Sequence, residues 1–106
     1  MPSELDNARS YVRAGNYGAA LRSAEAVARR PEASAEVQAA VERLTSVAGQ
    51  KMQNRVERAK SWAAAGQQAR AAEEYRGIVK TFRGTSLESR AKALQDVFLR
   101  QEGRGG

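Results

Sequence analysis

The sequence of 106 residues contains no cysteine and no histidine. The absence of cysteine excludes disulfides, thiolate nucleophiles and zinc sites built from thiolates. The absence of histidine excludes imidazole bases, the Ser-His-Asp triad and the commonest metal ligand. The sequence also lacks the Gly-x-x-x-x-Gly-Lys-Ser/Thr pattern of a phosphate-binding loop. We therefore expect neither an enzyme nor a bound cofactor or metal.

Long hydrophobic runs are missing as well. No apolar stretch approaches the roughly 20 residues of a transmembrane helix. Residues 1–7 lack the basic flank and apolar stretch of a secretory signal. We expect a cytoplasmic protein without a membrane span. The abundance of Ala, Arg and Gly is typical of genomes with a high GC content and indicates a bacterial source.

Positive charge is in excess, because 18 Lys and Arg stand against 12 Asp and Glu and give a net charge of +6. Such an excess favours acidic partners, either an acidic peptide or a nucleic acid. Acidic residues are nevertheless interspersed with the basic ones, so solvated helix faces are the simpler interpretation. The adjacent Glu73 and Glu74 are interpreted in the same way, as solvated side chains near Arg70 and Arg76.

The sequence predicts an all-α protein, because Ala, Leu, Arg, Glu and Gln dominate and no segment alternates as a strand would. Its length suits a single domain, expected over residues 1–102. The predicted segments are an antiparallel hairpin over 4–30, a long helix over 34–65, a second hairpin over 68–101 and a flexible Gly/Arg tail over 103–106. Thr85 and Glu88 have the spacing of a capping box before the last helix.

Gly49 lies in the middle of the long helix and leaves two arrangements open. In the first, the helix is continuous and the chain has five helices, since one glycine costs only about 1 kcal/mol against alanine. In the second, Gly15, Gly49 and Gly84, which are 34 and 35 residues apart, mark three turns of a six-helix array. We favour five helices, because the surroundings of Gly15 are matched better at Gly66. A chain reversal at Gly49 would contradict this choice.

The most informative feature is an internal repeat with an offset of 51 residues. Residues 8–11 align with residues 59–62, and residues 14–16 align with residues 65–67. The later matches are Ala20 with Ala71, Val27 with Ile78 and Ala28 with Val79. Glycine lets the chain leave a helix in a left-handed conformation, and alanine lets two helix axes approach closely. Both halves therefore predict an antiparallel helical hairpin.

This spacing resembles that of the tetratricopeptide repeat family, in which a Gly-polar-Tyr turn joins two helices and small residues lie on both sides of it. Gly15, Asn16 and Tyr17 match that turn well, whereas Gly66 and Gln67 match it loosely. The resemblance covers residues 4–101, although the offset of 51 departs from the family period of about 34 residues. It implies a scaffold of helical hairpins that binds other proteins and has no enzymatic activity.

In that family, the first helices of successive hairpins form a groove that holds a peptide or a partner helix. Carried over by position, the resemblance implies that Arg9, Arg13 and Lys60 face the groove, with Asp6 and Glu57 beside them. A basic groove favours an acidic segment and speeds its encounter through electrostatic attraction. We therefore expect a protein or peptide partner that carries acidic side chains.

Apolar residues near the C-terminus give a second candidate surface. Leu94, Val97 and Phe98 either pack inward on the preceding helix or face another subunit or the rest of a longer chain. The long apolar stripe over residues 37–63 suggests a homodimer in the same way. Two other functions stay open, namely a basic helical protein that binds nucleic acid and a structural terminal domain of a larger polypeptide.

Overall fold

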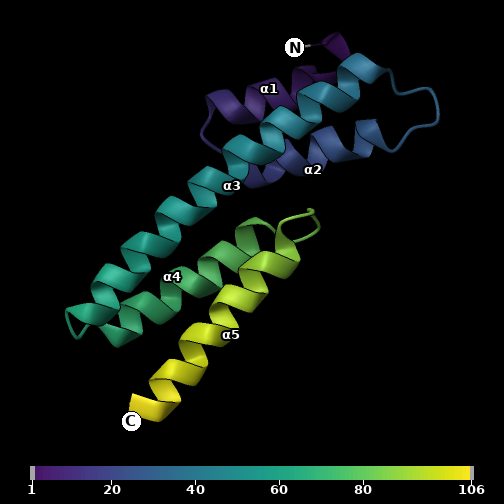
Figure 1. Cartoon of the computed structure of the whole chain (residues 1–106). Helices are drawn as coiled ribbons and strands as arrows, with labels where there is room; N and C mark the ends of the chain where they lie inside the picture. The colour runs from purple at the N-terminus through teal and green to yellow at the C-terminus, as the bar shows by residue number, and fades with distance from the viewer. Residues whose placement is uncertain (1, 106) are drawn as a thin grey trace. The chain divides into compact units, whose positions relative to one another are not determined.

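A computed structural model describes residues 2–105, with side chains to residue 102. All regular secondary structure in this range is helical. The elements are the 3₁₀ turn η1 (Ser3–Leu5) and the helices α1 (Asp6–Arg13), α2 (Tyr17–Ala28), α3 (Ala35–Ala64), α4 (Gln68–Thr81) and α5 (Glu88–Gly105) (Figure 1). The predicted all-α fold, with five helices and a long third one, is confirmed.

The turn between α1 and α2 is closed by a glycine in the left-handed conformation, as the sequence predicted. Gly15 has a φ of 77°. The N–H of Asn16 donates to the carbonyl of Tyr11 at 2.8 Å, and the N–H of Gly15 donates to the carbonyl of Val12 at 2.9 Å. These two bonds make a Schellman motif, which satisfies the last carbonyls of α1. The side chain of Asn16 then caps α2 by accepting from the N–H of Ala19 at 3.1 Å.

The turn between α3 and α4 repeats this backbone geometry 51 residues later. Gly66 has a φ of 86°. The N–H of Gln67 donates to the carbonyl of Trp62 at 2.8 Å, and the N–H of Gly66 donates to the carbonyl of Ala63 at 3.0 Å. Gln67 does not cap α4 with its side chain, which instead accepts a hydrogen bond from Arg70 at 3.4 Å. The repeat seen in the sequence is therefore a repeat of chain reversals.

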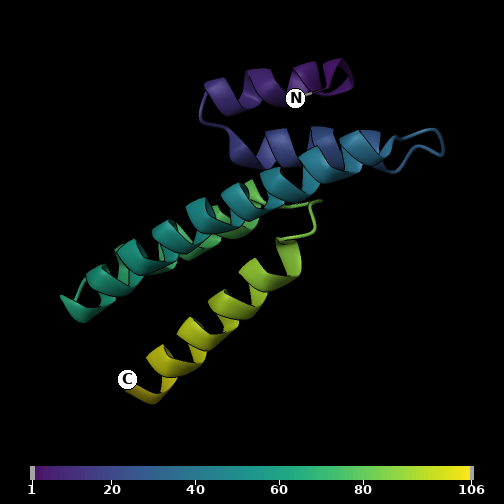
Figure 2. The same cartoon turned by 45° about the horizontal axis from the view of Figure 1, so that its top comes forward.

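Helix α3 is continuous through Gly49, which confirms the five-helix prediction and contradicts the six-helix alternative. Ala48, Met52 and Val56 are fully buried on successive turns. The apolar stripe therefore runs past the glycine without interruption, and a chain reversal there would expose it to water. Both views show one unbroken helix (Figures 1 and 2).

The chain divides into two compact units, Met1–Gly49 and Gln50–Gly106. The first unit contains η1, α1, α2 and the first half of α3, and the second contains the second half of α3, α4 and α5. Helices α1 and α2 form one antiparallel hairpin, and α4 and α5 form another (Figure 1). Helix α3 is therefore the last helix of one unit and the first helix of the next.

Residues 51 apart also occupy matching buried positions in the two units. The side chains of Ala8 and Ala59 are completely buried, as are those of Ala20 and Ala71. Among larger residues, Val27 matches Ile78 and, outside the predicted matches, Leu5 matches Val56; Ala40 and Ala91 form a further buried alanine pair that was not predicted. Alanine at these positions leaves room for close contact between helices. The internal repeat thus extends from the sequence to the packing of each core.

The turn before α5 is stabilised by Thr85 and Glu88, but not as the predicted capping box. The N–H of Thr85 donates to the carbonyl of Phe82 at 3.1 Å, so it does not bind the carboxylate of Glu88. That carboxylate accepts instead from the N–H of Gly84 at 3.1 Å, and the hydroxyl of Thr85 accepts from the N–H of Leu87. The predicted tail, residues 103–106, coincides with the last turn of α5 and with Gly106, which lies outside the described residues.

Candidate functional site

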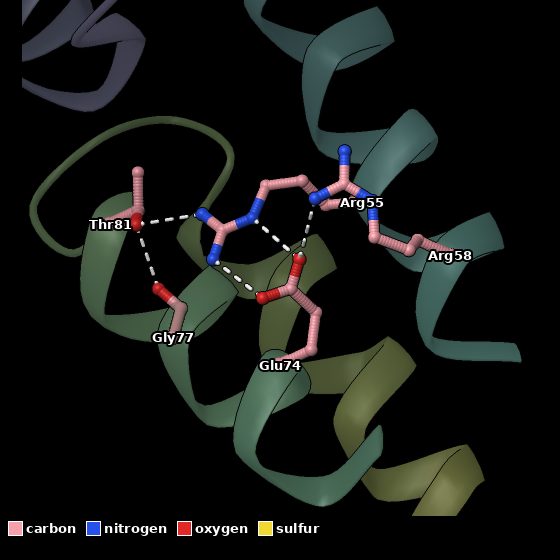
Figure 3. A network of polar contacts seen from close by, with 5 residues as sticks. All are labelled: Arg55, Arg58, Glu74, Gly77 and Thr81. Carbon is pink, nitrogen blue, oxygen red and sulfur yellow. Dashed lines mark hydrogen bonds and ion pairs between the residues drawn. The ribbon is translucent and has the colours of Figure 1, made fainter. Parts of the chain in front are cut away.

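A polar network joins α3 to α4 within the second unit (Figure 3). The guanidinium of Arg55 on α3 donates to both carboxylate oxygens of Glu74 on α4, from Nε to Oε2 and from Nη2 to Oε1, each at 3.1 Å. The side chain of Glu74 is only 15% exposed. A two-point pair between planar groups fixes orientation as well as distance. Arg55 and Glu74 therefore set the position of these two helices along each other.

The remaining nitrogen of Arg55 is satisfied by α4 as well. Nη1 of Arg55 donates to the hydroxyl of Thr81 at 2.9 Å, and that hydroxyl donates to the carbonyl of Gly77 at 2.8 Å. A Cβ at Gly77 would lie only 3.0 Å from Nη2 of Arg55. Gly77 is therefore the position at which α4 leaves space for the guanidinium. Sequence reasoning missed this role, because an isolated glycine inside a helix gives no indication of what lies against it.

We define the α3–α4 seam as the surface formed by Lys51, Arg55, Arg58 and Trp62 of α3 together with Arg70 and Glu74 of α4. Arg58 is 60% exposed, and its Nη1 lies 4.0 Å from Oε2 of Glu74. The guanidinium of Arg70 stacks over the ring of Trp62, with 4.2 Å between its central carbon and the ring centroid. The interpretation of Glu74 as a solvated residue is wrong, since it accepts from Arg55 and is largely buried. Glu73 is exposed, as expected.

The cations predicted to bind a partner are on the surface of both units. Arg9 and Arg13 lie one turn apart on α1, in the first unit, and Arg13 is exposed. Nη1 of Arg9 lies 4.0 Å from the carboxylate of Asp6. Lys60 is on α3 in the second unit, where its ammonium lies 3.7 Å from the carboxylate of Glu57.

The three residues of the predicted apolar surface differ in their exposure. Phe98 is buried, and its ring centroid lies 4.8 Å from that of Tyr75 on α4. Burial, and then the negative charge of Glu57, raises the pKa of Tyr75. Leu94 is half-buried, whereas Val97 is 46% exposed. Of this set, Val97 is the residue whose side chain is most available at the surface.

A surface hollow of about 340 Å³ lies in the first unit. It is lined by Val12 of α1, Tyr17 of α2 and four residues of α3, namely Ala40, Arg43, Leu44 and Val47. Val47 is 47% exposed, so the rim of the hollow offers an apolar side chain to solvent. The hollow could not be found from the sequence, because its walls come from three successive helices whose packing on one another no local pattern specifies.

Within the described part of the chain, no helix combines the length and the apolar composition that a membrane crossing requires. Among the same residues, no three acidic side chains gather as the ligands of a metal ion would. Comparisons of the chain with protein-family models, with curated proteins and with solved structures give no match.

Proposed function

We propose that this protein is a non-enzymatic interaction module of helical hairpins, similar in plan to tetratricopeptide repeat proteins. The observation that carries the proposal is the hollow of the first unit, whose apolar walls come from α1, α2 and α3. Apolar concave surfaces between helices are common sites for a partner's anchor side chain. The matching turns at Gly15 and Gly66 support the hairpin plan, while the offset of 51 residues departs from that family's period.

The walls of the hollow indicate the chemistry of the partner. Val12, Leu44 and Val47 offer apolar contacts, and Arg43 supplies a positive charge at the same place. A short amphipathic helix with an aliphatic residue next to a carboxylate matches this combination. Arg9 and Arg13, on α1 of the same unit, add attraction for an acidic segment. The proposed ligand is therefore an acidic amphipathic segment of another protein.

Selection of peptides from a displayed random library against the full chain tests this function. We expect the enriched peptides to pair aliphatic and acidic residues at helical spacing. They should bind the Val47→Glu variant at least about tenfold more weakly, because the new carboxylate blocks the hollow and repels acidic ligands. Val97→Glu is the matched control, since Val97 is exposed to the same extent as Val47 but lies on α5.

Two results would contradict the proposed function. One is the absence of any enriched peptide, which would leave a structural role in a larger polypeptide as the better interpretation. The other is equal binding of the selected peptides to the Val47→Glu and Val97→Glu variants, which would show that they do not use the hollow. A stronger loss with Val97→Glu would move the interaction surface to α5.

A further inference from the structure

The positive charge of the protein belongs to one unit. Residues 1–49 contain six Lys and Arg and six Asp and Glu, so their formal charge is zero. Residues 50–106 contain 12 Lys and Arg and six Asp and Glu, so they carry the entire net charge of +6. Acidic residues are interspersed with basic ones in both units, but they balance the positive charge only in residues 1–49. An excess of this size on about half of a small protein creates a positive field that attracts polyanions.

Within the second unit, the α3–α4 seam carries more cations than its single carboxylate can neutralise. Glu74 accepts two hydrogen bonds from Arg55 and lies 4.0 Å from Arg58. Each of the three guanidinium nitrogens of Arg55 donates one hydrogen bond, to Glu74 or to Thr81, so the contribution of Arg55 to the seam is mainly its charge. Arg58 makes only the long contact with Glu74 among the contacts described, and its side chain is 60% exposed. The seam is therefore positive and still has donor groups to offer.

Arg58 and Arg70 each contact a side chain of the facing helix within the α3–α4 seam. Arg58 lies one turn before Trp62 on α3, and Arg70 lies one turn before Glu74 on α4. Arg58 is drawn toward Glu74, and Arg70 stacks on Trp62 (Figure 3 shows the former). Side chains restrained in this way lose less conformational entropy when they bind a ligand. Each of the two guanidinium groups, one on each helix of the seam, can therefore bind an oxyanion of an extended polyanion.

We propose that the α3–α4 seam of the second unit binds the phosphate backbone of a nucleic acid, without regard to sequence. Arginine outnumbers lysine by eight to four in residues 50–106, and the planar guanidinium matches phosphate oxygens at two points. The half-buried indole of Trp62 lies on the same surface, and aromatic rings beside arginines are a common feature of surfaces that bind nucleic acids. This activity is separate from peptide binding in the first unit.

Fluorescence anisotropy with labelled single-stranded and duplex oligonucleotides tests the proposal on the full chain. We expect binding at about 50 mM salt, with an affinity that falls linearly with salt on logarithmic axes. The double variant Arg58→Gln/Arg70→Gln should bind at least about tenfold more weakly, and its salt slope should fall by about two. Both residues are exposed, and circular dichroism checks that the variant keeps its helices.

A matched control removes the same charge from the other unit. Arg29 and Arg30 are also exposed and lie outside the proposed peptide site, so Arg29→Gln/Arg30→Gln should change the affinity by less than about twofold. No binding of any oligonucleotide, or equal losses in the two double variants, would overturn the proposal. Displacement of the oligonucleotide by equimolar poly-glutamate would also overturn it and would assign the seam to acidic proteins. Failure here leaves the peptide selection with Val47→Glu unaffected, so the two proposals fail independently.

Discussion

Gly77 gives α4 the space that the guanidinium of Arg55 occupies, and its replacement is a direct test of the seam. We expect Gly77→Ala to destabilise the protein by about 1 kcal/mol. Alanine favours the helix by about 1 kcal/mol, but its Cβ would lie 3.0 Å from Nη2 of Arg55 and weaken hydrogen bonds to charged and polar groups that contribute about 1.5–3 kcal/mol. The free energy of unfolding in urea measures the balance.

In an Arg55→Met background, Gly77→Ala should raise the free energy of unfolding instead of lowering it. Without the guanidinium, only the helix propensity of alanine remains, so Gly77→Ala should stabilise that variant by up to about 1 kcal/mol. If Gly77→Ala had the same effect in both backgrounds, Arg55 would not be what requires a glycine at this position.

Glu88 makes the turn before α5 sensitive to acid. The N–H of Gly84, and then the ammonium of Lys92 at 3.0 Å, hold the pKa of Glu88 below its ordinary value. A lowered folded-state pKa gives stability that is complete above the unfolded-state pKa and is lost as the pH falls through the folded-state value. We expect Glu88→Gln to lower the Tm at pH 7, and the difference from the original chain to shrink as the pH falls through the carboxyl range.

Thermal unfolding followed by circular dichroism between pH 7 and about pH 3 measures this difference. Glu73→Gln is the control, since Glu73 is exposed and should show no such convergence. A Tm difference for Glu88→Gln that stays constant with pH would mean that the negative charge of Glu88 is not what stabilises the turn.

The case of Glu74 shows how far the burial of a single residue can be predicted from the sequence. Glu73 and Glu74 are chemically identical neighbours, and only the rotation of α4 about its axis decides which one faces α3. One signal was present, since Glu74 lies three residues after Ala71 and four before Ile78, at the border of the buried stripe. Its partner Arg55 could not be found in this way, because the pairing depends on how α3 and α4 are positioned along each other.

At the scale of elements, the two glycine turns should respond alike to substitution. Gly15 and Gly66 have φ values of 77° and 86°, and a Cβ at either position would meet no atom within 4 Å. The cost of alanine is therefore conformational rather than steric, about 1–2 kcal/mol at each position. Urea unfolding of Gly15→Ala and Gly66→Ala measures it, and the asparagine variants should lose less. Markedly unequal losses would contradict the equivalence of the two turns.

The positions of the helices could be predicted because their causes are local. Gly15 and Gly66 end helices through their own backbone freedom, and residues near them in sequence supply the hydrogen bonds. The side on which Phe98 packs could not be predicted in this way, since an apolar residue on the last helix can pack either on the preceding helix or on another chain or domain. Its burial against Tyr75 depends on how α5 packs on α4, which no local pattern fixes. The hollow of the first unit was unpredictable for the same reason.

At the scale of the whole molecule, the uneven charge predicts that the two units respond differently to salt. Like charges repel within residues 50–106, and salt screens this repulsion over about 10 Å at 0.1 M. We expect added salt to slow amide hydrogen exchange in α4 and α5, while exchange in α1 and α2 changes little. The same slowing in both units would indicate a general salt effect. The charge division could have been counted from the sequence, but only with the boundary at Gly49 already known.

The unbroken path of α3 has a consequence for how such a chain can evolve. Ala48, Gly49 and Gln50 form the same tripeptide as Ala65, Gly66 and Gln67, yet the first continues a helix and the second reverses the chain. The difference is that Met52 and Val56 are buried, and their burial stabilises a straight helix beyond Gly49. Polar substitutions of Met52 and Val56 would remove this stabilisation but would leave the tripeptide around Gly49 unchanged. The same glycines are therefore compatible with more, shorter hairpins or with fewer, longer helices, depending on the residues that follow each glycine.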